Sequence, residues 1–471
     1  MPRRVPVGAD PILTVAQMRA AEQALIDSGT SVDELMRTAG RGAGEWVWRL
    51  SGGRAVTVLC GPGNNGGDGW VLAELIRTRG GDVAVIAPRE PATDAARHAR
   101  AGYRGVVLDP DDWRTGEVFV DCLFGSGLTR PLSDADVALL ARLGAAHHAT
   151  VAVDLPSGID SDAGISLNSA LPRIDLTVAL GAWKFAHWTM TAAAMMGEKR
   201  LVGIGIGDVD CAAHLLARPR LARPPLDAHK YTRGLLAVIG GAMPGAAQLA
   251  ARAAMHGGAG YVKLLGKRGA APPPEPVIDN QPLSEAVADR RISALLIGPG
   301  LGRDDTERER LELALVPHRP LVLDADALHL LRPDDLTDRT APTVLTPHEG
   351  EMAALEASFG LDGRGLRRDR ALALARASGA VVLLKGPDSL IAAPDGELVC
   401  APPALSWLSV AGTGDVLAGV LASRIATGVA PFAACSEALW LHGEAARLAG
   451  PAFTAGQLAD AVQGAVGAAL A

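Results

Sequence analysis

Two clusters of glycine and aspartate mark the places where this sequence could do chemistry. In the second half, Gly412-Thr-Gly414-Asp415 comes directly before an apolar helical pattern. Glycines at a helix start free backbone N–H groups to hold a transferring phosphoryl group, and Asp415 stands where it could take a proton from an attacking hydroxyl. This combination is typical of a kinase-like site. The plainer interpretation is a glycine-rich helix start with an aspartate in its first turn.

The first half of the chain has a glycine turn of its own. A strand pattern ending at Cys60 runs into G-P-G-N-N-G-G-D-G (61–69), and a helical pattern follows. A strand, a glycine turn and a helix N-terminus together form an anion site that suits a pyrophosphate. The next strand does not end in the acid that a Rossmann dehydrogenase uses to hold the ribose, but Arg89 follows it and could suit a 2′-phosphate.

Two further strand patterns in the first half end at aspartates, Asp121 in D-C-L-F-G-S-G-L-T-R-P and Asp154 in D-L-P-S-G. Ligands of open parallel sheets bind at the carboxyl ends of the strands. There Asn65, Asp121 and Ser157 would offer an all-oxygen set to an alkali or alkaline-earth cation, and Asp154 would remain for proton transfer. Either aspartate could instead cap a turn. The three motifs in this order favour a functional site.

Other polar residues of the second half also follow strand patterns. Lys385-Gly-Pro-Asp-Ser389 offers a cation and a hydroxyl for phosphates, and Gly298–Gly302 and Thr346–Glu351 end two further strands. Beside the proline turn, a ligand contact is the favoured interpretation of His348 over a structural histidine.

Three more titratable residues of the second half have no such clear assignment. Asp324 and Asp326 could hold Mg²⁺ or cap the next helix. His442 lies inside a helical pattern beside a tryptophan, and we expect it to be structural.

Short apolar runs that alternate with helical patterns must position these motifs. The runs read as strands buried on both faces, hence mainly parallel. In the first half they are 55–60, 82–87, 117–124, 150–156, 176–181 and 200–207. In the second half they are G-L-L-A-V-I-G-G, Y-V-K-L-L-G, A-L-L-I-G-P-G, L-V-L-D-A-D-A-L, T-V-L-T-P-H and A-V-V-L-L-K-G. The pattern predicts two α/β domains, the first a doubly wound parallel sheet. The proline-rich stretch Asp208–Ala228 has few strand signals, so we expect the junction there.

The bulk composition is that of a globular chain. Its 471 residues are 48% hydrophobic and 21% charged, which predicts packed cores. The net charge is −7, so no global positive field exists to collect nucleic acid or anionic membranes, and we expect neither as a partner. Five scattered cysteines without a C-x-x-C pair, no secretory signal and no long apolar run predict a cytoplasmic protein.

The motif order in the first half resembles the N-terminal domain of the bifunctional NAD(P)H-hydrate repair enzymes, which epimerises hydrated NADH and NADPH. The resemblance implies a Rossmann-like domain over residues 1–215, potassium bound by Asn65, Asp121 and Ser157, and catalysis by Asp154. Lys184 matches a family lysine that commonly follows proline, where this chain has Trp183. The residues implied to contact the hydrated dinucleotide are Asn64, Asn65, Gly66, Gly67, Asp68, Gly125, Ser126, Gly127, Leu128, Thr129, Arg130, Pro131 and Asp154.

The second half resembles the ADP- or ATP-dependent NAD(P)H-hydrate dehydratase, which has a ribokinase-like fold. The resemblance implies such a domain over residues 225–471, with catalysis by Asp415 and Mg²⁺ beside the nucleotide. Glu349 stands where the family commonly has proline, and its charge could weaken an anionic ligand nearby. The implied contacts with the hydrate are Ala246, Gly302, His348 and Asp415, and those with ADP or ATP are Lys385, Gly386, Pro387, Asp388, Ser389 and Gly414.

We therefore expect an enzyme that repairs NADHX and NADPHX, the hydrates of NADH and NADPH, and that forms a homo-oligomer. One domain would interconvert the R and S hydrates. In the other, Asp415 would deprotonate the ring hydroxyl, the nucleotide would phosphorylate it, and loss of phosphate would restore the cofactor. One alternative is a kinase for a hydroxymethylpyrimidine or thiazole alcohol with an accessory N-terminal domain. Another is an N-terminal domain that binds ligands without catalysis.

Overall fold

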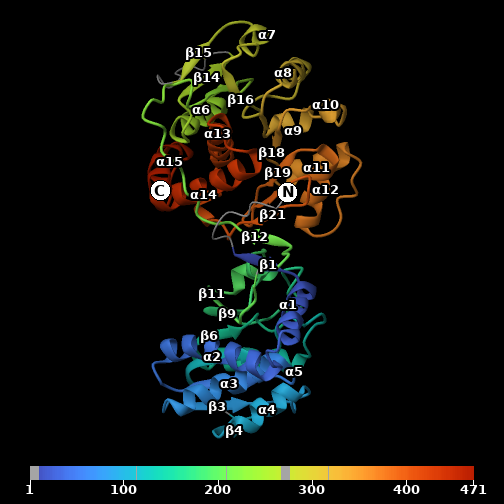
Figure 1. The fold of residues 1–471 in the computed structure, drawn as a ribbon, viewed down its shortest axis with the longest axis vertical. Helices are drawn as coiled ribbons and strands as arrows, with labels where there is room; N and C mark the ends of the chain where they lie inside the picture. Colours follow the sequence, from blue (N-terminus) through green and yellow to red (C-terminus); the bar gives the residue numbers. More distant parts are fainter. Residues whose placement is uncertain (1–9, 113, 208, 267–275, 317, 471) are drawn as a thin grey trace. The chain divides into compact units, whose positions relative to one another are not determined.

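The structure, a computed structural model, describes residues 10–112, 114–207, 209–266, 276–316 and 318–470. Two compact units divide the chain (Figure 1): an N-terminal unit, Asp10–His214, and a C-terminal unit that begins at Leu215. The domain limits 1–215 and 225–471 stay predictions. Residues 1–9, Ala471, and Asp208 in the expected junction, lie outside the described residues.

The N-terminal unit is built on a seven-stranded sheet of parallel neighbours in the order β11-β9-β6-β5-β2-β3-β4. Every apolar run expected there contributes a strand. The edge strand β4 was not expected. Its Val106 and Val107 are exposed, unlike the residues of the buried strands that the apolar runs predict. The strands are β2 (Val56–Cys60), β3 (Val83–Ile86), β4 (Val106–Leu108), β5 (Gly116–Cys122), β6 (His147–Val153), β9 (Leu176–Leu180) and β11 (Glu198–Val202).

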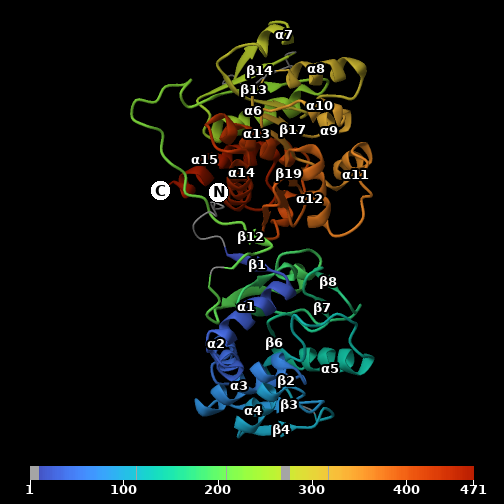
Figure 2. The ribbon, with the colours of Figure 1, turned by 45° about the vertical axis from the view of Figure 1, so that its right-hand side comes forward.

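Helices cover both faces of this sheet, which makes it doubly wound (Figure 2). Apolar side chains of α1, α2 and α3 pack on one face, and those of α5 pack on the other. The helices are α1 (Val15–Asp27), α2 (Val32–Ser51), α3 (Asn64–Thr78), α4 (Asp94–Gly102) and α5 (Asp134–Ala145). Shorter elements are β1 (Pro11–Leu13), β7 (Ile159–Asp160), β8 (Ile165–Ser166), β10 (Trp183–Lys184), β12 (Ala213–Leu215), η1 (Phe185–His187) and η2 (Ala192–Met195).

The C-terminal unit has a second sheet, ordered β21-β20-β19-β18-β17-β16-β13-β14-β15. The neighbours from β19 to β15 are parallel, and β20 and β21 add antiparallel strands. The expected runs form β13 (Leu235–Ile239), β14 (Tyr261–Leu265), β16 (Ile292–Ile297), β17 (Leu321–Leu323), β18 (Thr343–Leu345) and β19 (Val381–Leu384). Three strands were not expected: β15 (Val277–Asp279), β20 (Leu390–Ala392) and β21 (Leu398–Cys400).

The main hydrophobic core of this unit lies between one face of the sheet and α6, α13, α14 and α15. The alanine-rich surfaces of these helices allow close packing: a Cβ on Gly419 would lie 2.1 Å from the backbone of Ala250 in α6. The helices are α6 (Pro244–His256), α7 (Leu283–Ala286), α8 (Asp305–Leu315), α9 (Asp326–Leu330), α10 (Asp334–Thr337), α11 (Glu349–Ser358), α12 (Arg367–Ser378), α13 (Thr413–Ala426), α14 (Pro431–Ala449), α15 (Ala455–Ala469) and the 3₁₀ turn η3 (Ser406–Leu408).

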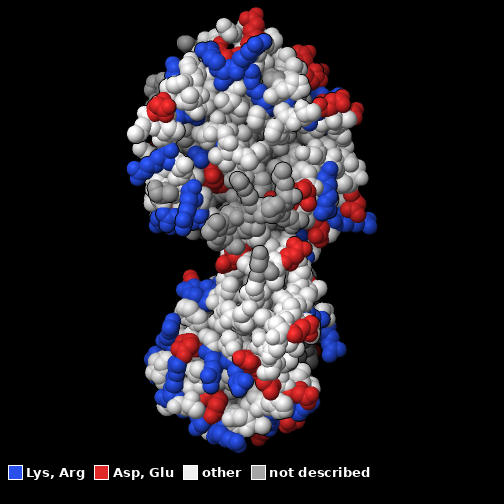
Figure 3. Space-filling model, viewed as in Figure 1, with Lys and Arg blue, Asp and Glu red and all other residues white. Residues whose placement is uncertain are grey.

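Charged side chains of both signs are interspersed over the described surface in Figure 3. No helix of the described residues is both long and apolar enough to cross a membrane.

Candidate active sites

The glycine turn after β2 is needed because two stretches of backbone come too close for a side chain. A Cβ on Gly61 would lie 1.7 Å from the carbonyl oxygen of Leu123, and one on Gly66 would lie 1.9 Å from that of Gly61. α3 then begins at Asn64 without a side-chain cap. Its first N–H groups are therefore left to bind an anion at the positive end of the helix.

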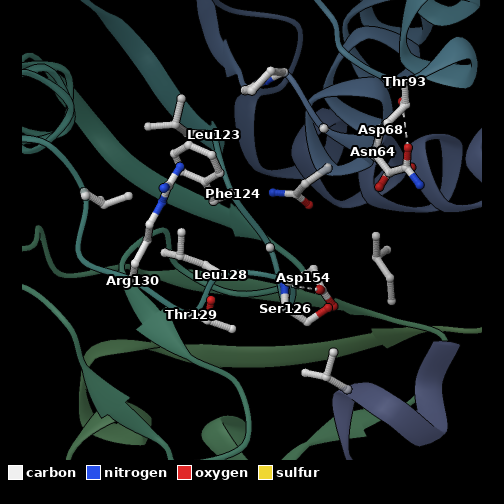
Figure 4. A pocket seen from close by; sticks show the side chains of 18 of the residues that line it. Asn64, Asp68, Thr93, Leu123, Phe124, Ser126, Leu128, Thr129, Arg130 and Asp154 are labelled. Carbon is white, nitrogen blue, oxygen red and sulfur yellow. Dashed lines mark hydrogen bonds between the residues drawn. The ribbon is translucent and has the colours of Figure 1, made fainter.

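A cavity of about 930 Å³ opens at this helix start (Figure 4). Asn64, Asn65 and Asp68 line it from the first motif, and the whole turn 125–131 and Asp154 line it from the other two. The structure thus brings the three predicted segments to one place. Gly66 and Gly67 are buried in packing contacts and are not among the lining residues, so their contact with substrate stays a prediction.

Asp154 follows β6 with a backbone φ of 64°, uncommon for a residue other than glycine. Its carboxylate accepts hydrogen bonds from Lys184 Nζ (2.5 Å) and from the N–H of Ser126 (3.0 Å). Burial raises the pKa of Asp154, but the Lys184 ammonium has the opposite effect and the net pKa lies below its usual value. Asp154 therefore stays ionised, as a proton acceptor must.

His187 holds this unusual turn in place. Its Nε2–H donates to the carbonyl oxygen of Asp154 (2.8 Å), and its Nδ1 accepts from the N–H of Lys184 (2.9 Å). Burial lowers the pKa of His187 to about 4. The ring is therefore neutral and acts as a fixed brace.

Asp68 lines the same cavity but has a different environment from Asp154. No described residue donates a hydrogen bond to its carboxyl group. Burial raises the pKa of Asp68 well above its ordinary value, and the charges of Asp154 and Glu22 raise it further. Among the carboxyl groups that line the cavity, Asp68 thus has a raised pKa and Asp154 a lowered one, a separation found in acid–base pairs.

Asn65, Asp121 and Ser157 were predicted to hold potassium, and two of them are joined directly. The Ser157 hydroxyl and N–H donate to the two oxygens of Asp121 at 2.7 and 2.8 Å. The Asn65 amide is buried with neither its oxygen nor its nitrogen partnered. Asp121 is fully buried, and no lysine or arginine of the described residues pairs with it. An orphaned amide oxygen and an uncompensated carboxylate fit a hard monovalent cation.

In the C-terminal unit, Gly412 precedes α13 with a φ of 91° that favours glycine. The helix begins at Thr413 with no side-chain cap, and half-buried Asp415 lies in its first turn. Burial raises the pKa of Asp415 to about 7, helped by Asp324 and Glu351 and opposed by Lys385. A carboxyl group with this pKa can accept a proton near neutrality.

Lys385, predicted to bind phosphates, follows β19 and faces two carboxylates, Asp324 after β17 and Glu351 in the first turn of α11. Its Nζ lies 2.5 Å from Asp324 Oδ1 and 3.7 Å from Glu351 Oε2. The Thr346 hydroxyl donates to the same Asp324 oxygen at 2.7 Å. A Cβ on Gly414 would lie 3.7 Å from Lys385 Nζ, so the glycine turn lies beside this ammonium group.

The structure places three further predicted contacts, Ser389, Gly302 and Ala246, in or beside turns. The Ser389 hydroxyl closes its own loop by bonding Gly386. Asp326 accepts from the N–H of Gly302 (3.0 Å) and from Arg303 (2.6 Å), and α9 has no side-chain cap, so Asp326 does not cap the next helix. A Cβ on Gly300 would lie 3.0 Å from that of Ala246, so Ala246 lies beside the turn that contains Gly302.

His348 caps α11: its Nδ1 accepts from the N–H groups of Gly350 and Glu351. Its side chain is 59% exposed, so the ring remains accessible.

Glu349 pairs with Arg367 and Arg370. Two guanidinium groups thus pair with its charge, and the expectation that this charge would weaken a nearby anionic ligand stays a prediction. His442 is structural, as expected: it is buried and bonds the carbonyl oxygen of Thr413 (2.9 Å).

Sequence reasoning missed the groups that set these environments, namely His187, Glu22 and Arg367. His187 gave a weak signal as a polar residue in an apolar stretch beside Lys184. The others resemble ordinary surface residues, because their partners lie far away in the sequence.

Comparisons with known proteins cover both units. The family model described as YjeF-related protein N-terminus matches residues 32–186, and the one described as NAD(P)H-hydrate dehydratase matches residues 236–465. The bifunctional NAD(P)H-hydrate repair enzyme of Gloeobacter violaceus is 34% identical over 92% of this chain and 92% of its own. That of Mycobacterium tuberculosis is 36% identical over 88% and 89%. The chain belongs to the bifunctional NAD(P)H-hydrate repair enzymes.

Membership of this repair-enzyme family confirms the resemblance found in the sequence, and with it the Rossmann-like and ribokinase-like fold classes of the two halves. A small-molecule kinase is not better supported, because the relatives span both halves. A solved structure of the ADP/ATP-dependent NAD(P)H-hydrate dehydratase from Bacillus subtilis, co-crystallised with ATP/Mg²⁺, is 28% identical. It covers 53% of this chain and 94% of its own, with a TM-score of 0.47.

Proposed function

We propose that this chain repairs hydrated NADH and NADPH, with an epimerase in residues 1–215 and an ADP- or ATP-dependent dehydratase in residues 225–471. The chain belongs to the repair-enzyme family. The observation that carries the proposal is that each of its two units has an aspartate beside an uncapped helix start, at the carboxyl end of a parallel sheet. Asp154 and Asp415 are the catalytic residues. NADHX and NADPHX are the substrates of both units.

In the epimerase, Asp154 takes the proton from the hydroxyl of the hydrated ring. The bond from that carbon to the ring nitrogen breaks, its electron pair goes to nitrogen, and protonated Asp68 supplies a proton there. The resulting aldehyde turns over and the nitrogen attacks its other face. The N–H proton then returns to Asp68, and Asp154 gives its proton back to the oxygen, so both aspartates regain their starting states. The lowered pKa of Asp154 and the raised pKa of Asp68 favour the protonation states that this reaction requires.

Potassium would be held by Asn65, Asp121 and Ser157, and it would supply positive charge next to the turn that begins at Gly125. The protein's own part is to keep the buried Asp121 carboxylate and the Asn65 amide in place. A Cβ on Gly125 would lie 3.2 Å from Asn65 Oδ1 and 3.0 Å from Asp154 Oδ2, so this glycine lets the turn lie against both residues.

In the dehydratase, Asp415 takes the proton from the ring hydroxyl while the hydroxyl oxygen attacks the terminal phosphorus of ADP or ATP. The nucleotide leaves with one phosphate fewer. Loss of the new phosphate ester and of a ring proton restores the dihydropyridine. Lys385 to Ser389 and Gly414 hold the nucleotide, and Ala246, Gly302 and His348 contact the hydrate.

Mg²⁺ in proteins is commonly bound by one or two carboxylates together with substrate phosphates. Asp324 is the carboxylate that suits it here, since both oxygens of Asp326 already accept hydrogen bonds and Asp415 is the proposed base. It would offset the charge of the phosphates during transfer.

Incubation of the purified protein with a mixture of R and S hydrates and ADP or ATP tests the proposal. Absorbance near 340 nm should return in full with nucleotide and not without it. A stable phosphorylated product would instead indicate an alcohol kinase. Recovery that stops at the S fraction would indicate an N-terminal unit that binds without catalysis.

We also place the protein in the cytoplasm as a homo-oligomer. All five cysteines are free, which suits a reducing compartment. Light scattering on the purified chain gives the subunit number, and a monomer would contradict this part of the proposal.

A further inference from the structure

The loop proposed to hold the nucleotide, Lys385–Ser389, joins β19 to β20, and Arg367 contacts it at two points. Arg367 is the first residue of α12. Its Nη1 donates to the carbonyl oxygen of Asp388 (2.9 Å) and pairs with the Asp388 carboxylate. Its Nη2 donates to the carbonyl oxygen of Lys385 (3.2 Å). One guanidinium group therefore ties the start of the loop to its end.

The guanidinium group also packs tightly against the middle of the loop. A Cβ on Gly386 would lie 2.6 Å from Arg367 Nη2. The remaining nitrogen, Nε, donates to Glu349 Oε2 at 3.2 Å. All three sides of the planar group thus have partners, and the Arg367 side chain is only 24% exposed.

We propose that Arg367 is a positioning residue that presets the nucleotide loop of the dehydratase, and that Glu349 orients it. This inference rests on the proposed function, because it assumes that the loop binds ADP or ATP. Glu349 then supports nucleotide binding indirectly, although its negative charge alone would oppose it. Lysine cannot replace arginine here, since a single ammonium group cannot bridge both ends of the loop and reach Glu349.

The test compares steady-state kinetics of Arg367→Met, Arg367→Lys and the wild type in the hydrate assay. A loop that has lost its preset shape must be ordered on binding, so we expect the KM for ADP or ATP to rise about tenfold or more. The KM for the hydrate should stay within about twofold, and Arg367→Lys should not restore the nucleotide KM. An unchanged nucleotide KM in Arg367→Met, or a lower kcat alone, overturns the inference.

Arg370→Met is the matched control. Arg370 pairs with Glu349 and Glu356 but is not hydrogen bonded to the loop. Its loss should leave the nucleotide KM within about twofold of the wild type. A rise equal to that of Arg367→Met would show that the cluster acts only through general stability, and would overturn the inference.

If Arg367→Met does not fold, Glu349→Pro decides. Glu349 is the first residue of α11, a position that favours proline. The variant should keep its fold and raise the nucleotide KM about threefold, because Arg367 loses the carboxylate that orients it. An unchanged KM would overturn the inference. Failure of the wild type to regenerate reduced cofactor with either nucleotide would instead refute the proposed function.

Discussion

Each unit holds a lysine–aspartate pair at the carboxyl edge of its sheet, but the two pairs differ in which aspartate they engage. In the N-terminal unit Lys184 Nζ contacts Asp154, the proposed base itself, at 2.5 Å. In the C-terminal unit Lys385 Nζ contacts Asp324 at the same distance, and Asp415, the proposed base, is left without an ion pair.

This difference shifts the pKa values of the two proposed bases in opposite directions. Asp154 has a lowered pKa despite its burial, whereas the pKa of Asp415 is raised to about 7 by burial and by neighbouring carboxylates. A general base works best when its pKa lies near the operating pH, and a paired carboxylate stays ionised at the expense of basicity. In the proposed mechanism the two units would therefore deprotonate a ring hydroxyl with bases of unequal strength.

The sharpest test of this comparison replaces each base by its isosteric amide. Asp154→Asn should lower epimerisation about 10²- to 10⁴-fold and leave dehydration of the S hydrate intact, and Asp415→Asn should do the reverse. Asparagine is preferable to alanine at residue 154, because it tolerates the positive φ and still offers Lys184 an oxygen. Chiral chromatography of the hydrates and absorbance at 340 nm follow the two reactions separately. Parallel loss of both activities in one variant would contradict the division of labour.

The next effect concerns stability. Lys184→Met would leave the Asp154 carboxylate buried without its cation, which costs about 3–5 kcal/mol of local unfolding free energy in the N-terminal unit. Lys385→Met should cost less, since Asp324 keeps the Thr346 hydroxyl and Lys385 is 16% exposed where Lys184 is 1% exposed. Hydrogen exchange read by mass spectrometry on peptides of each unit measures both changes.

A double variant controls this prediction. Asp154→Asn combined with Lys184→Met removes both charges and should recover most of the stability lost in Lys184→Met, because no uncompensated ion remains. If the double variant were as unstable as the single one, packing of the Lys184 stem, rather than the charge pair, would be responsible.

The sequence predicts the strands of these sites well, because buried parallel strands appear as short apolar runs that end where the chemistry begins. Asp121, Asp154 and Asp415 were found by their places at such ends or at a helix start. The strands β4, β15, β20 and β21 escaped prediction: each is only three residues long, and Val106 and Val107 of β4 are exposed.

The partners of the site residues could not be predicted, for a physical reason. Asp154 and Lys184 are 30 residues apart, and Lys385 and Asp324 are 61 apart. Which lysine contacts which aspartate depends on how the strands and helices pack within each unit. The pKa values of these aspartates depend on the same packing. His348 shows the same limit, since a proline turn before a helix is equally compatible with a ligand contact and with the cap that the structure has.

The opposite pKa shifts predict different pH profiles in one polypeptide. Asp415 accepts a proton only when ionised, so dehydration should rise about tenfold from pH 6 to pH 8, with an inflection near 7. Epimerisation needs ionised Asp154, whose pKa is lowered, so this group should cause no inflection between pH 5 and 8.

Glu351→Gln sharpens the pH test. Glutamine can replace the carboxylate that caps α11, but it removes a charge that raises the pKa of Asp415. The inflection for dehydration should therefore move to lower pH while epimerisation is unaffected. An inflection that stays in place would mean that another group limits the rate.

The smallest expected effect concerns backbone strain, which both sites contain. Ala325, between Asp324 and Asp326, has φ 46° and ψ −122°, and Asp154 has φ 64°. Ala325→Gly relieves a strain of about 1–3 kcal/mol and costs about 0.5–1 kcal/mol in unfolded-chain entropy, so the C-terminal unit should gain about 1 kcal/mol. Asp154→Gly relieves strain of the same kind but leaves Lys184 buried without its partner, so the N-terminal unit should lose stability. Thermal unfolding with hydrogen exchange of each unit gives both signs. Stabilisation by both glycines would mean that the Lys184–Asp154 pair contributes nothing to the fold, and the contrast between the two sites would then reduce to their pKa values.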